Sequence, residues 1–314
     1  GEQNSANYTI GGKAKSLINL KLKGYNVPDF LIIPAEIFDE VLLGSIVNNE
    51  TQISQRKQSL LDFTLLQDDR EKISEILLSW DFPSQAVAVR SSVADEDSEK
   101  DAFAGLMDTF MNLTSLEDVW LAIAKCAASA YSDRAIAYRK QKNLTLNARP
   151  AVIIQKQIVP DVSAVVFSTF PEYPQEMAIH AVWGFGEGLV SGALDADEYY
   201  ISKKTGETTS QNIAVKEQRF KVNEGKGLIL SPVEPGQQLI PCLLPHHLNE
   251  IYKIASELEV QAKQAQDIEL LIKNDEIFLV QSRPITQIIP EVIVYDNSNI
   301  QESYCVVTTP LTFS

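Results

Sequence analysis

Residues 267–286 read DIELLIKNDEIFLVQSRPIT, and the rest of the predicted fold is organised around this stretch. Apolar and polar residues alternate along its two arms, which is typical of strands with one buried face. The polar residues 273–276 between the arms favour a turn. We therefore predict a β-hairpin, in a register that pairs Lys273 with Ile277.

The predicted hairpin gathers polar side chains on one of its faces. In this register Glu269 lies opposite Gln281. Two residues further along the strands, Asp267 lies opposite Arg283. Mg2+ prefers oxygen ligands of the kind that a carboxylate and an amide provide, and an arginine suits a phosphate group. The hairpin is therefore suited to a metal-bound polyphosphate, and an ordinary hairpin with a solvated polar face is the alternative.

The composition limits the kind of protein. The chain has 314 residues, enough for two domains or one two-lobed unit, and its hydrophobic content of 45% is that of a globular protein. A net charge of −15 argues against a nucleic-acid partner. The three cysteines show no CxxC spacing, which indicates a reducing compartment, the cytoplasm. No apolar run approaches the roughly 20 residues that a membrane span needs.

A second polar feature lies near the N-terminus, in the sequence GGKAKSLINLKLKG at 11–24. Its two glycines and the apolar repeat behind them predict a turn that enters a helix. Lys13 falls in the first helical turn, where the helix dipole disfavours a cation unless an anion is also present. Free N–H groups, a glycine turn and a lysine together suit a phosphate. A surface lysine on an ordinary helix is the alternative.

A third feature is a strand, a polar loop and a returning strand. The apolar run AVAV leads directly to Arg90, and an arginine at the end of such a run must find an anion or reach solvent. The loop passes through FAG at 103–105 and reaches a predicted strand at 106–113 that contains Thr109. A loop of this kind can fold over phosphates, whereas an exposed acidic hairpin is the alternative.

The pattern changes toward strands near residue 150, where we place the boundary between two lobes. In the strand 151–159, Gln155 and Gln157 interrupt an otherwise apolar run. This pattern suits a strand whose edge meets a base, and an edge strand with a solvated face is the alternative.

The sequence WGFGEG at 183–188 has glycines at alternate positions, which permit a ligand to approach the backbone closely. The spacing differs from that of a dinucleotide-binding turn. The acidic residues that follow, Asp195, Asp197 and Glu198, are expected to be solvated. The three histidines show no catalytic or metal-ligand spacing.

Five blocks carry a resemblance to a known family: GGKAKSL (11–17), VRSS with ED, FAG and DT (89–109), VIIQKQIVPDVSAVVFS (152–168), WGFGEGLVSG with DEYY (183–200), and DIEL with VQSRP (267–284). In this order they resemble the ATP-binding domain of the phosphoenolpyruvate synthase and pyruvate phosphate dikinase family, which also includes rifamycin phosphotransferases. The resemblance covers nearly the whole chain. It implies an α+β, ATP-grasp-like fold in two lobes, with the nucleotide cleft between them.

The resemblance also implies roles for individual residues, with ATP and Mg2+ as cofactors. Lys13, Arg90 and Arg283 are expected to contact the phosphates of ATP and to act in catalysis. Glu269 and Gln281 are expected to hold Mg2+. The other expected nucleotide contacts are Gly105 and Thr109 in a phosphate-covering loop, Gln155, Gln157 and Ile158 on an adenine-side strand, and Glu187 near the ribose or phosphates.

The same resemblance implies a domain organisation: an N-terminal lobe at 1–150, a C-terminal lobe at 151–289, and the start of a linker to a further domain at 290–314. In this family a histidine on a separate swivelling domain accepts the phosphoryl group, and another domain binds the final acceptor. The chain is therefore expected to be the ATP-binding part of a phosphotransferase that donates to such a histidine and ultimately to pyruvate, without completing a turnover alone. The alternatives are the same domain of a rifamycin-type phosphotransferase and a non-catalytic nucleotide-sensing module.

Overall fold

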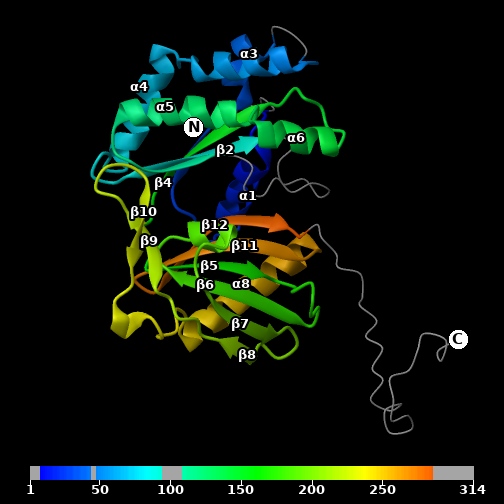
Figure 1. Ribbon diagram of the computed structural model, residues 1–314, viewed down its shortest axis with the longest axis vertical. Coiled ribbons are helices and arrows are strands. Elements are labelled where there is room, and N and C mark those ends of the chain that lie inside the picture. The colour runs from blue at the N-terminus through cyan, green and yellow to red at the C-terminus, as the bar shows by residue number, and fades with distance from the viewer. Residues whose placement is uncertain (1–7, 44–46, 94–107, 286–314) are drawn as a thin grey trace, which may run out of the picture.

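The computed structural model describes residues 8–43, 47–93 and 108–285, which form two lobes stacked along the long axis of the molecule (Figure 1). Each lobe is built on an antiparallel sheet with helices packed against it, so the predicted α+β class is confirmed. The predicted linker at 290–314 and the predicted loop residue Gly105 lie outside the described residues. None of the helices in the described part of the chain combines the length and the apolar character needed to cross a membrane.

The upper lobe in Figure 1 contains a four-stranded sheet in the order β1-β4-β2-β3. Its strands are β1 (Phe30–Ile33), β2 (Val87–Val93), β3 (Thr109–Leu113) and β4 (Pro150–Lys156). The accompanying helices are η1 (Ala35–Phe38), α2 (Asp39–Leu42), α3 (Glu50–Leu61), α4 (Gln67–Ser79), α5 (Leu116–Ser129) and α6 (Asp133–Gln141). Ser115 and Ser132 begin α5 and α6 because their side chains accept hydrogen bonds from backbone N–H groups of the first turn.

The lower lobe contains a six-stranded sheet in the order β12-β11-β5-β6-β7-β8. Its strands are β5 (Val162–Phe167), β6 (Glu176–Trp183), β7 (Asp197–Ser202), β8 (Thr208–Asn212), β11 (Gln266–Lys273) and β12 (Glu276–Pro284). Helix α8 (Pro245–Ala262) covers one face and buries Leu248, Ile251, Ala255 and Leu258 at helical spacing. Smaller elements are α7 (Glu187–Ser191), the hairpin of β9 (Gln218–Val222) and β10 (Leu228–Pro232), and η2 (Pro235–Gln237).

Two features of the chain connect the lobes. Strand β4 pairs with β1 and β2, so the change from one sheet to the other falls between Lys156 and Val162; the lobe boundary at residue 150 stays a prediction. Helix α1 (Gly11–Leu22) precedes the upper lobe in sequence, yet it buries Ala14, Leu17 and Leu20 in the hydrophobic core of the lower lobe.

The central hairpin forms as predicted, with one change of register. Glu269 lies opposite Gln281, and Asp267 lies opposite Arg283, which confirms the predicted cross-strand pairs. The predicted pairing of Lys273 with Ile277 is wrong, because Lys273 lies opposite Glu276.

A tight turn and a β-bulge account for that difference. Asn274 and Asp275 form a two-residue turn with φ of 51° and 63°, values that Asn and Asp tolerate better than most residues. Val280 is then the extra residue of a β-bulge, which restores the predicted pairing beyond it.

One buried ion pair lies at the edge of the lower core. Lys216 Nζ donates to Asp197 Oδ1 at 2.5 Å, and the two side chains are 1% and 0% exposed. Asp197 also accepts from the backbone N–H groups of Ala214 and Cys242 at 3.0 and 2.7 Å. The expectation that Asp197 is solvated is therefore wrong, because β7 begins at this residue and turns its side chain inward.

Candidate functional site

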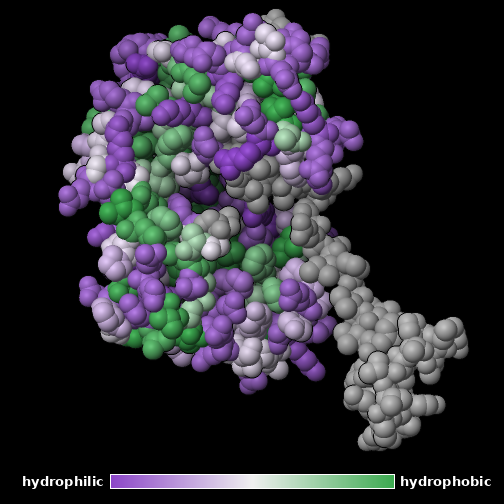
Figure 2. Space-filling model, in the orientation of Figure 1, coloured by the Kyte–Doolittle hydropathy of each residue, from purple (hydrophilic) through white to green (hydrophobic). Residues whose placement is uncertain are grey.

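A cavity of about 310 Å³ lies between the two sheets, where the surface is hollowed between the lobes (Figure 2). Every predicted site residue that the structure describes lines this cavity: Lys13, Arg90, Thr109, Gln155, Gln157, Ile158, Glu187, Glu269, Gln281 and Arg283. The structure thus brings together residues that are up to 270 positions apart in the sequence, from Lys13 to Arg283. What each of them binds stays a prediction.

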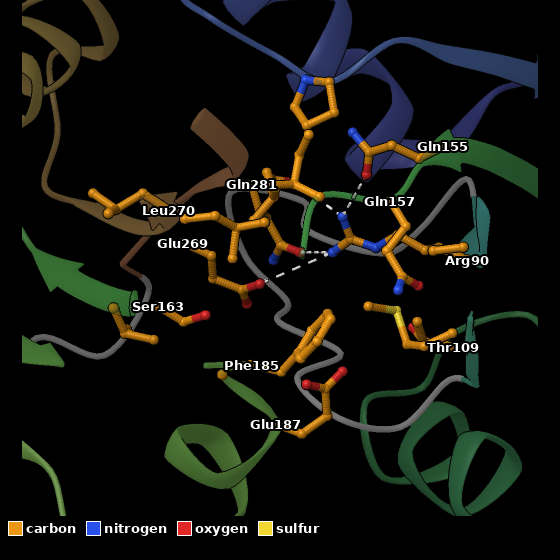
Figure 3. Close-up of a pocket in the computed structure, with 18 of the residues that line it drawn as sticks. Arg90, Thr109, Gln155, Gln157, Ser163, Phe185, Glu187, Glu269, Leu270 and Gln281 are labelled. Carbon is orange, nitrogen blue, oxygen red and sulfur yellow. Dashed lines mark hydrogen bonds and ion pairs between the residues drawn. The ribbon is translucent and has the colours of Figure 1, made fainter. Parts of the chain in front are cut away.

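Arg90 lies at the centre of the site and connects the two lobes (Figure 3). Its Nη1 donates to Gln155 Oε1 at 3.2 Å and to the Val280 carbonyl at 3.1 Å. Its Nη2 donates to Gln281 Oε1 at 3.3 Å and lies 3.9 Å from Glu269 Oε2. The bulge residue Val280 therefore contributes a carbonyl that accepts from Arg90. The anion that the Arg90 guanidinium faces is the Glu269 carboxylate on the hairpin of the lower lobe.

The second arginine of the hairpin is held by its cross-strand partner. Arg283 donates through Nε and Nη2 to Asp267 Oδ2 at 2.9 and 2.7 Å. Both side chains are only about one-seventh exposed, at 15% and 13%. The pair fixes the guanidinium of Arg283 at the cavity wall.

Close packing of α1 on β2 positions Lys13 at the cavity. The Ser92 hydroxyl donates to the Ile10 carbonyl at 2.8 Å and accepts from Ala14 N–H at 3.1 Å. Gly11 has φ of 75°, and a Cβ added there would lie 2.5 Å from the Ser92 backbone. A glycine is needed at this point because both the backbone angle and the contact exclude a side chain.

Gly11→Ala is expected to destabilise the fold more than Gly24→Ala. Both glycines have positive φ, so each substitution costs about 1–2 kcal/mol of backbone strain. Only at Gly11 does the new Cβ meet the Ser92 backbone, since nothing lies within 4 Å of it at Gly24. The excess loss is expected to be about 1–2 kcal/mol. Urea unfolding of the two variants measures it, and equal losses would contradict the close approach of α1 to β2.

Two buried glutamines line the other end of the cavity. Gln155 and Gln157 are each 4% exposed. The Oε1 of Gln155 accepts from Arg90, and the Oε1 of Gln157 accepts from the Asn112 N–H at 2.6 Å. Since each oxygen faces a group that can only donate, each amide nitrogen points elsewhere. Neither nitrogen has a hydrogen-bond partner among the described residues, which suits a ligand with acceptor atoms.

Glu187 lies at the start of α7, on the side of the cavity opposite the hairpin. Figure 3 shows its carboxyl group below the Glu269 carboxylate and the Gln281 amide. Desolvation between the cavity walls raises the pKa of Glu187, Arg90 lowers it and the Glu269 carboxylate raises it further. The site therefore contains two carboxyl groups whose mutual repulsion a cation would relieve.

Sequence reasoning missed several residues in or beside the cavity, among them Val280, Phe185 and Asn112. The alternation along the sequence predicts a regular strand at Val280, and a β-bulge has no sequence signal of its own. Phe185 lies inside the alternate-glycine run, and only the glycines of that run indicate a ligand. Asn112 had a usable signal, because Asn is depleted in strands and here interrupts TFMNL.

A histidine pair outside the cavity is structural. His246, His247 and Asp275 lie close enough to suggest a metal site. However, His247 Nδ1 accepts the backbone N–H of Leu244 at 3.2 Å, so its proton resides on Nε2, which lies 3.1 Å from Asp275 Oδ1. An Nε2 that donates to a carboxylate is not available as a ligand, and His247 instead caps α8 and contacts the hairpin turn.

A two-lobed α+β fold with a cavity of charged and amide side chains between its sheets defines a class of ligand-binding domain, and the comparisons with known proteins specify which one. Residues 84–298 match the family described as "Pyruvate phosphate dikinase, AMP/ATP-binding domain". The chain belongs to this family, which confirms the resemblance drawn from the sequence and the ATP-grasp-like fold class.

Several curated proteins are similar to nearly the whole chain. The rifampicin phosphotransferase of Bacillus subtilis is 30% identical over 92% of the chain and 36% of that protein. The probable phosphoenolpyruvate synthase of Methanocaldococcus jannaschii is 29% identical over 88% of the chain and 25% of that protein. The chain thus spans about a third or less of the length of these relatives. Among solved structures, D-alanyl-alanine synthetase A from Vibrio cholerae aligns with a TM-score of 0.34 at 12% identity, over 89% of the chain and 56% of that protein.

Proposed function

We propose that the chain binds Mg-ATP in the cavity between its lobes and presents a phosphoryl group to an acceptor outside the chain. The observation that carries this proposal is the composition of the cavity. It combines the cationic side chains of Lys13, Arg90 and Arg283 with two oriented amide groups and a set of oxygen ligands, and the chain belongs to an AMP/ATP-binding family.

Different residues of the chain would bind the base and the phosphates of ATP. The amide nitrogens of Gln155 and Gln157 would donate to acceptor atoms of the base. Lys13, Arg90 and Arg283 would bind the phosphates and offset the charge that develops during transfer. Catalysis of phosphoryl transfer rests mainly on such positioning and electrostatic stabilisation.

The oxygen atoms of the hairpin fit a magnesium ion. Glu269 and Gln281 are direct cross-strand partners, and both approach the same guanidinium nitrogen of Arg90, so their oxygens converge on one position. Carboxylate and amide oxygens without sulfur or imidazole are the ligands of a hard cation. When bound, the ion would neutralise charge on the phosphate oxygens.

The proposed acceptor is a histidine on a separate domain, and beyond it pyruvate, as in a phosphoenolpyruvate synthase-like dikinase. The similarity to a probable phosphoenolpyruvate synthase supports this choice. The similarity to rifampicin phosphotransferases favours a second candidate, the same ATP-binding role with an antibiotic-like hydroxyl compound as the final acceptor. Both candidates place the swivelling and acceptor-binding domains outside this chain and the protein in the cytoplasm. A nucleotide-sensing module without transfer activity is the third candidate.

Calorimetric titration with a non-hydrolysable ATP analogue tests the proposal. Binding is expected in the presence of Mg2+, and at least about 10-fold weaker binding is expected with EDTA, because the phosphates and the Glu269 carboxylate then lack their shared cation. Inorganic tripolyphosphate serves as a second ligand that lacks the base. Failure of the chain to bind the analogue under either condition would count against an ATP site in this cavity.

A further inference from the structure

The hairpin of β9 and β10 belongs to the lower lobe but reaches the upper one. In Figure 1 it stands beside the two stacked sheets and spans the level between them. One end of the hairpin bonds to strand β3, beside the glutamines that line the cavity. The other end bonds to the glycine-rich segment before Glu187, and the proposed function does not explain either set of contacts.

The contact on the upper lobe depends on a β-bulge in β3. Val89 pairs with Phe110 and Val87 pairs with Leu113, so β3 contains one residue more than β2 between these pairs. Asn112 in this bulge has φ of 56° and is 6% exposed. A bulge releases backbone groups from the ladder, and the N–H of Asn112 donates to Gln157 Oε1 at 2.6 Å.

The side chain of the same asparagine holds the tip of the hairpin. Asn112 Nδ2 donates to the Asn223 carbonyl at 2.9 Å and lies 3.4 Å from the Gly225 carbonyl. Beside it, Gly227 N–H donates to the Met111 carbonyl at 3.1 Å. Lys226 adds an ion pair with Asp118 at the start of α5. The tip is therefore bonded to the bulge through both backbone and side chain.

The lower end of the hairpin contacts the glycine-rich segment. Phe185 N–H donates to the Phe220 carbonyl at 3.2 Å. Gly184 has φ of 72°, and a Cβ added there would lie 2.5 Å from that same carbonyl. Phe185 lines the cavity, as does Glu187 two residues later. One hairpin thus contacts both the glutamine wall and the Glu187 wall.

We propose that Asn112 is a positioning residue for nucleotide recognition and that the hairpin of β9 and β10 acts through it as a clamp between the lobes. Asn112 connects Gln157 to the hairpin through its backbone N–H and its side chain. Its N–H orients the amide of Gln157, whose buried Nε2 has no partner among the described residues and is left for an acceptor atom of the ligand. Its side chain fixes the bulge, and hence that N–H, to the hairpin tip. The proposal rests on the proposed function for the identity of the ligand, whereas the link between hairpin and bulge does not.

The variant Asn112→Gly tests the clamp without disturbing the bulge, because glycine adopts positive φ readily and retains the N–H. Asn143→Gly is the matched control, since Asn143 also has positive φ, at 54°, and is exposed at the end of α6. Two quantities are measured: hydrogen exchange of the amides at 223–227, and the Kd values for the ATP analogue and for inorganic tripolyphosphate.

Faster exchange at 223–227 is expected in Asn112→Gly and not in Asn143→Gly. The Kd of the ATP analogue is expected to rise about 10-fold, as for the loss of one oriented hydrogen bond, with the Kd of tripolyphosphate unchanged. Gln157→Met is expected to produce the same selective rise without faster exchange at the hairpin tip. If Asn112 had only a structural role, Asn112→Gly would raise the Kd values of both ligands by the same factor, which would contradict the proposal.

Other results would overturn the proposal in whole or in part. Unchanged exchange at 223–227 in Asn112→Gly would mean that the side chain does not hold the hairpin. Faster exchange with an unchanged Kd for the ATP analogue would mean that the hairpin does not position Gln157. A wild-type chain that binds neither ligand would refute the proposed function and the recognition role of Asn112 together, while the exchange result would still decide whether Asn112 holds the clamp.

Discussion

Lys216→Met is expected to lower the free energy of unfolding by about 3–5 kcal/mol. The substitution leaves the Asp197 carboxylate in a site that is 0% exposed, and it removes the ammonium group that neutralises the charge. Two backbone N–H groups and the hydroxyl of Tyr199 remain as hydrogen-bond donors, but none of them carries a charge. A buried carboxylate without a cation is among the most destabilising features a core can contain. Urea unfolding followed by circular dichroism measures the loss.

The control for this prediction is Lys273→Met. Lys273 makes an ion pair of similar length with Asp161, at 2.8 Å, but the two side chains are 37% and 49% exposed. Loss of that exposed pair should cost no more than about 1 kcal/mol. The double variant Lys216→Met, Asp197→Asn should regain part of the stability, because it removes both buried charges. Equal losses in Lys216→Met and Lys273→Met would show that burial of the first pair has no energetic consequence.

The Asp197 pair also shows where sequence reasoning reaches its limit. The run of acidic residues around Asp197 has the composition of a solvated loop, and the sequence predicts it as such. Whether an acidic residue is buried depends on a cation that lies 19 residues away and on two backbone N–H groups from separate loops. These partners meet only in the folded chain, so no local pattern identifies them.

The central hairpin was predictable because its information is local. Alternation along 267–272 and 277–283 determines which side chains share a face, and this placed Glu269 opposite Gln281. The error at Lys273 was compensated by the bulge at Val280, so the correct pairs arose from two deviations that cancel. The bulge has a role of its own, since it turns the Val280 carbonyl toward Arg90.

The cavity residues were predictable only in combination. Each of Lys13, Arg90 and Gln155, taken alone, has an ordinary explanation as a surface or edge residue. Their order along the chain indicated the family, and the fold places them around one cavity. Asn112 was missed because its effect passes through Gln157 and the distant hairpin tip, and such coupling is a property of the tertiary structure.

Arg90→Met is expected to change nucleotide binding and metal binding in opposite directions. In the absence of a ligand, the Arg90 guanidinium lies between the predicted metal ligands, 3.3 Å from Gln281 Oε1 and 3.9 Å from Glu269 Oε2. Loss of a largely buried cation that binds phosphates is expected to raise the Kd of the Mg-ATP analogue about 100-fold, equivalent to about 3 kcal/mol. The same loss relieves the repulsion of a second cation, so Mn2+ without nucleotide is expected to bind more tightly. Calorimetry and electron paramagnetic resonance measure the two affinities.

Arg149→Met provides the control, because Arg149 likewise bridges two carboxylates, those of Glu36 and Asp39, but does not line the cavity. It is expected to leave both affinities unchanged. Arg90→Met is expected to weaken nucleotide binding and to strengthen Mn2+ binding. A partly unfolded variant would lose affinity for both ligands, so the two opposite changes distinguish a local effect from partial unfolding. Weaker Mn2+ binding in Arg90→Met, at unchanged unfolding free energy, would contradict the assignment of Glu269 and Gln281 as the metal ligands. Tighter Mn2+ binding with unchanged nucleotide affinity would instead remove Arg90 from the phosphate site.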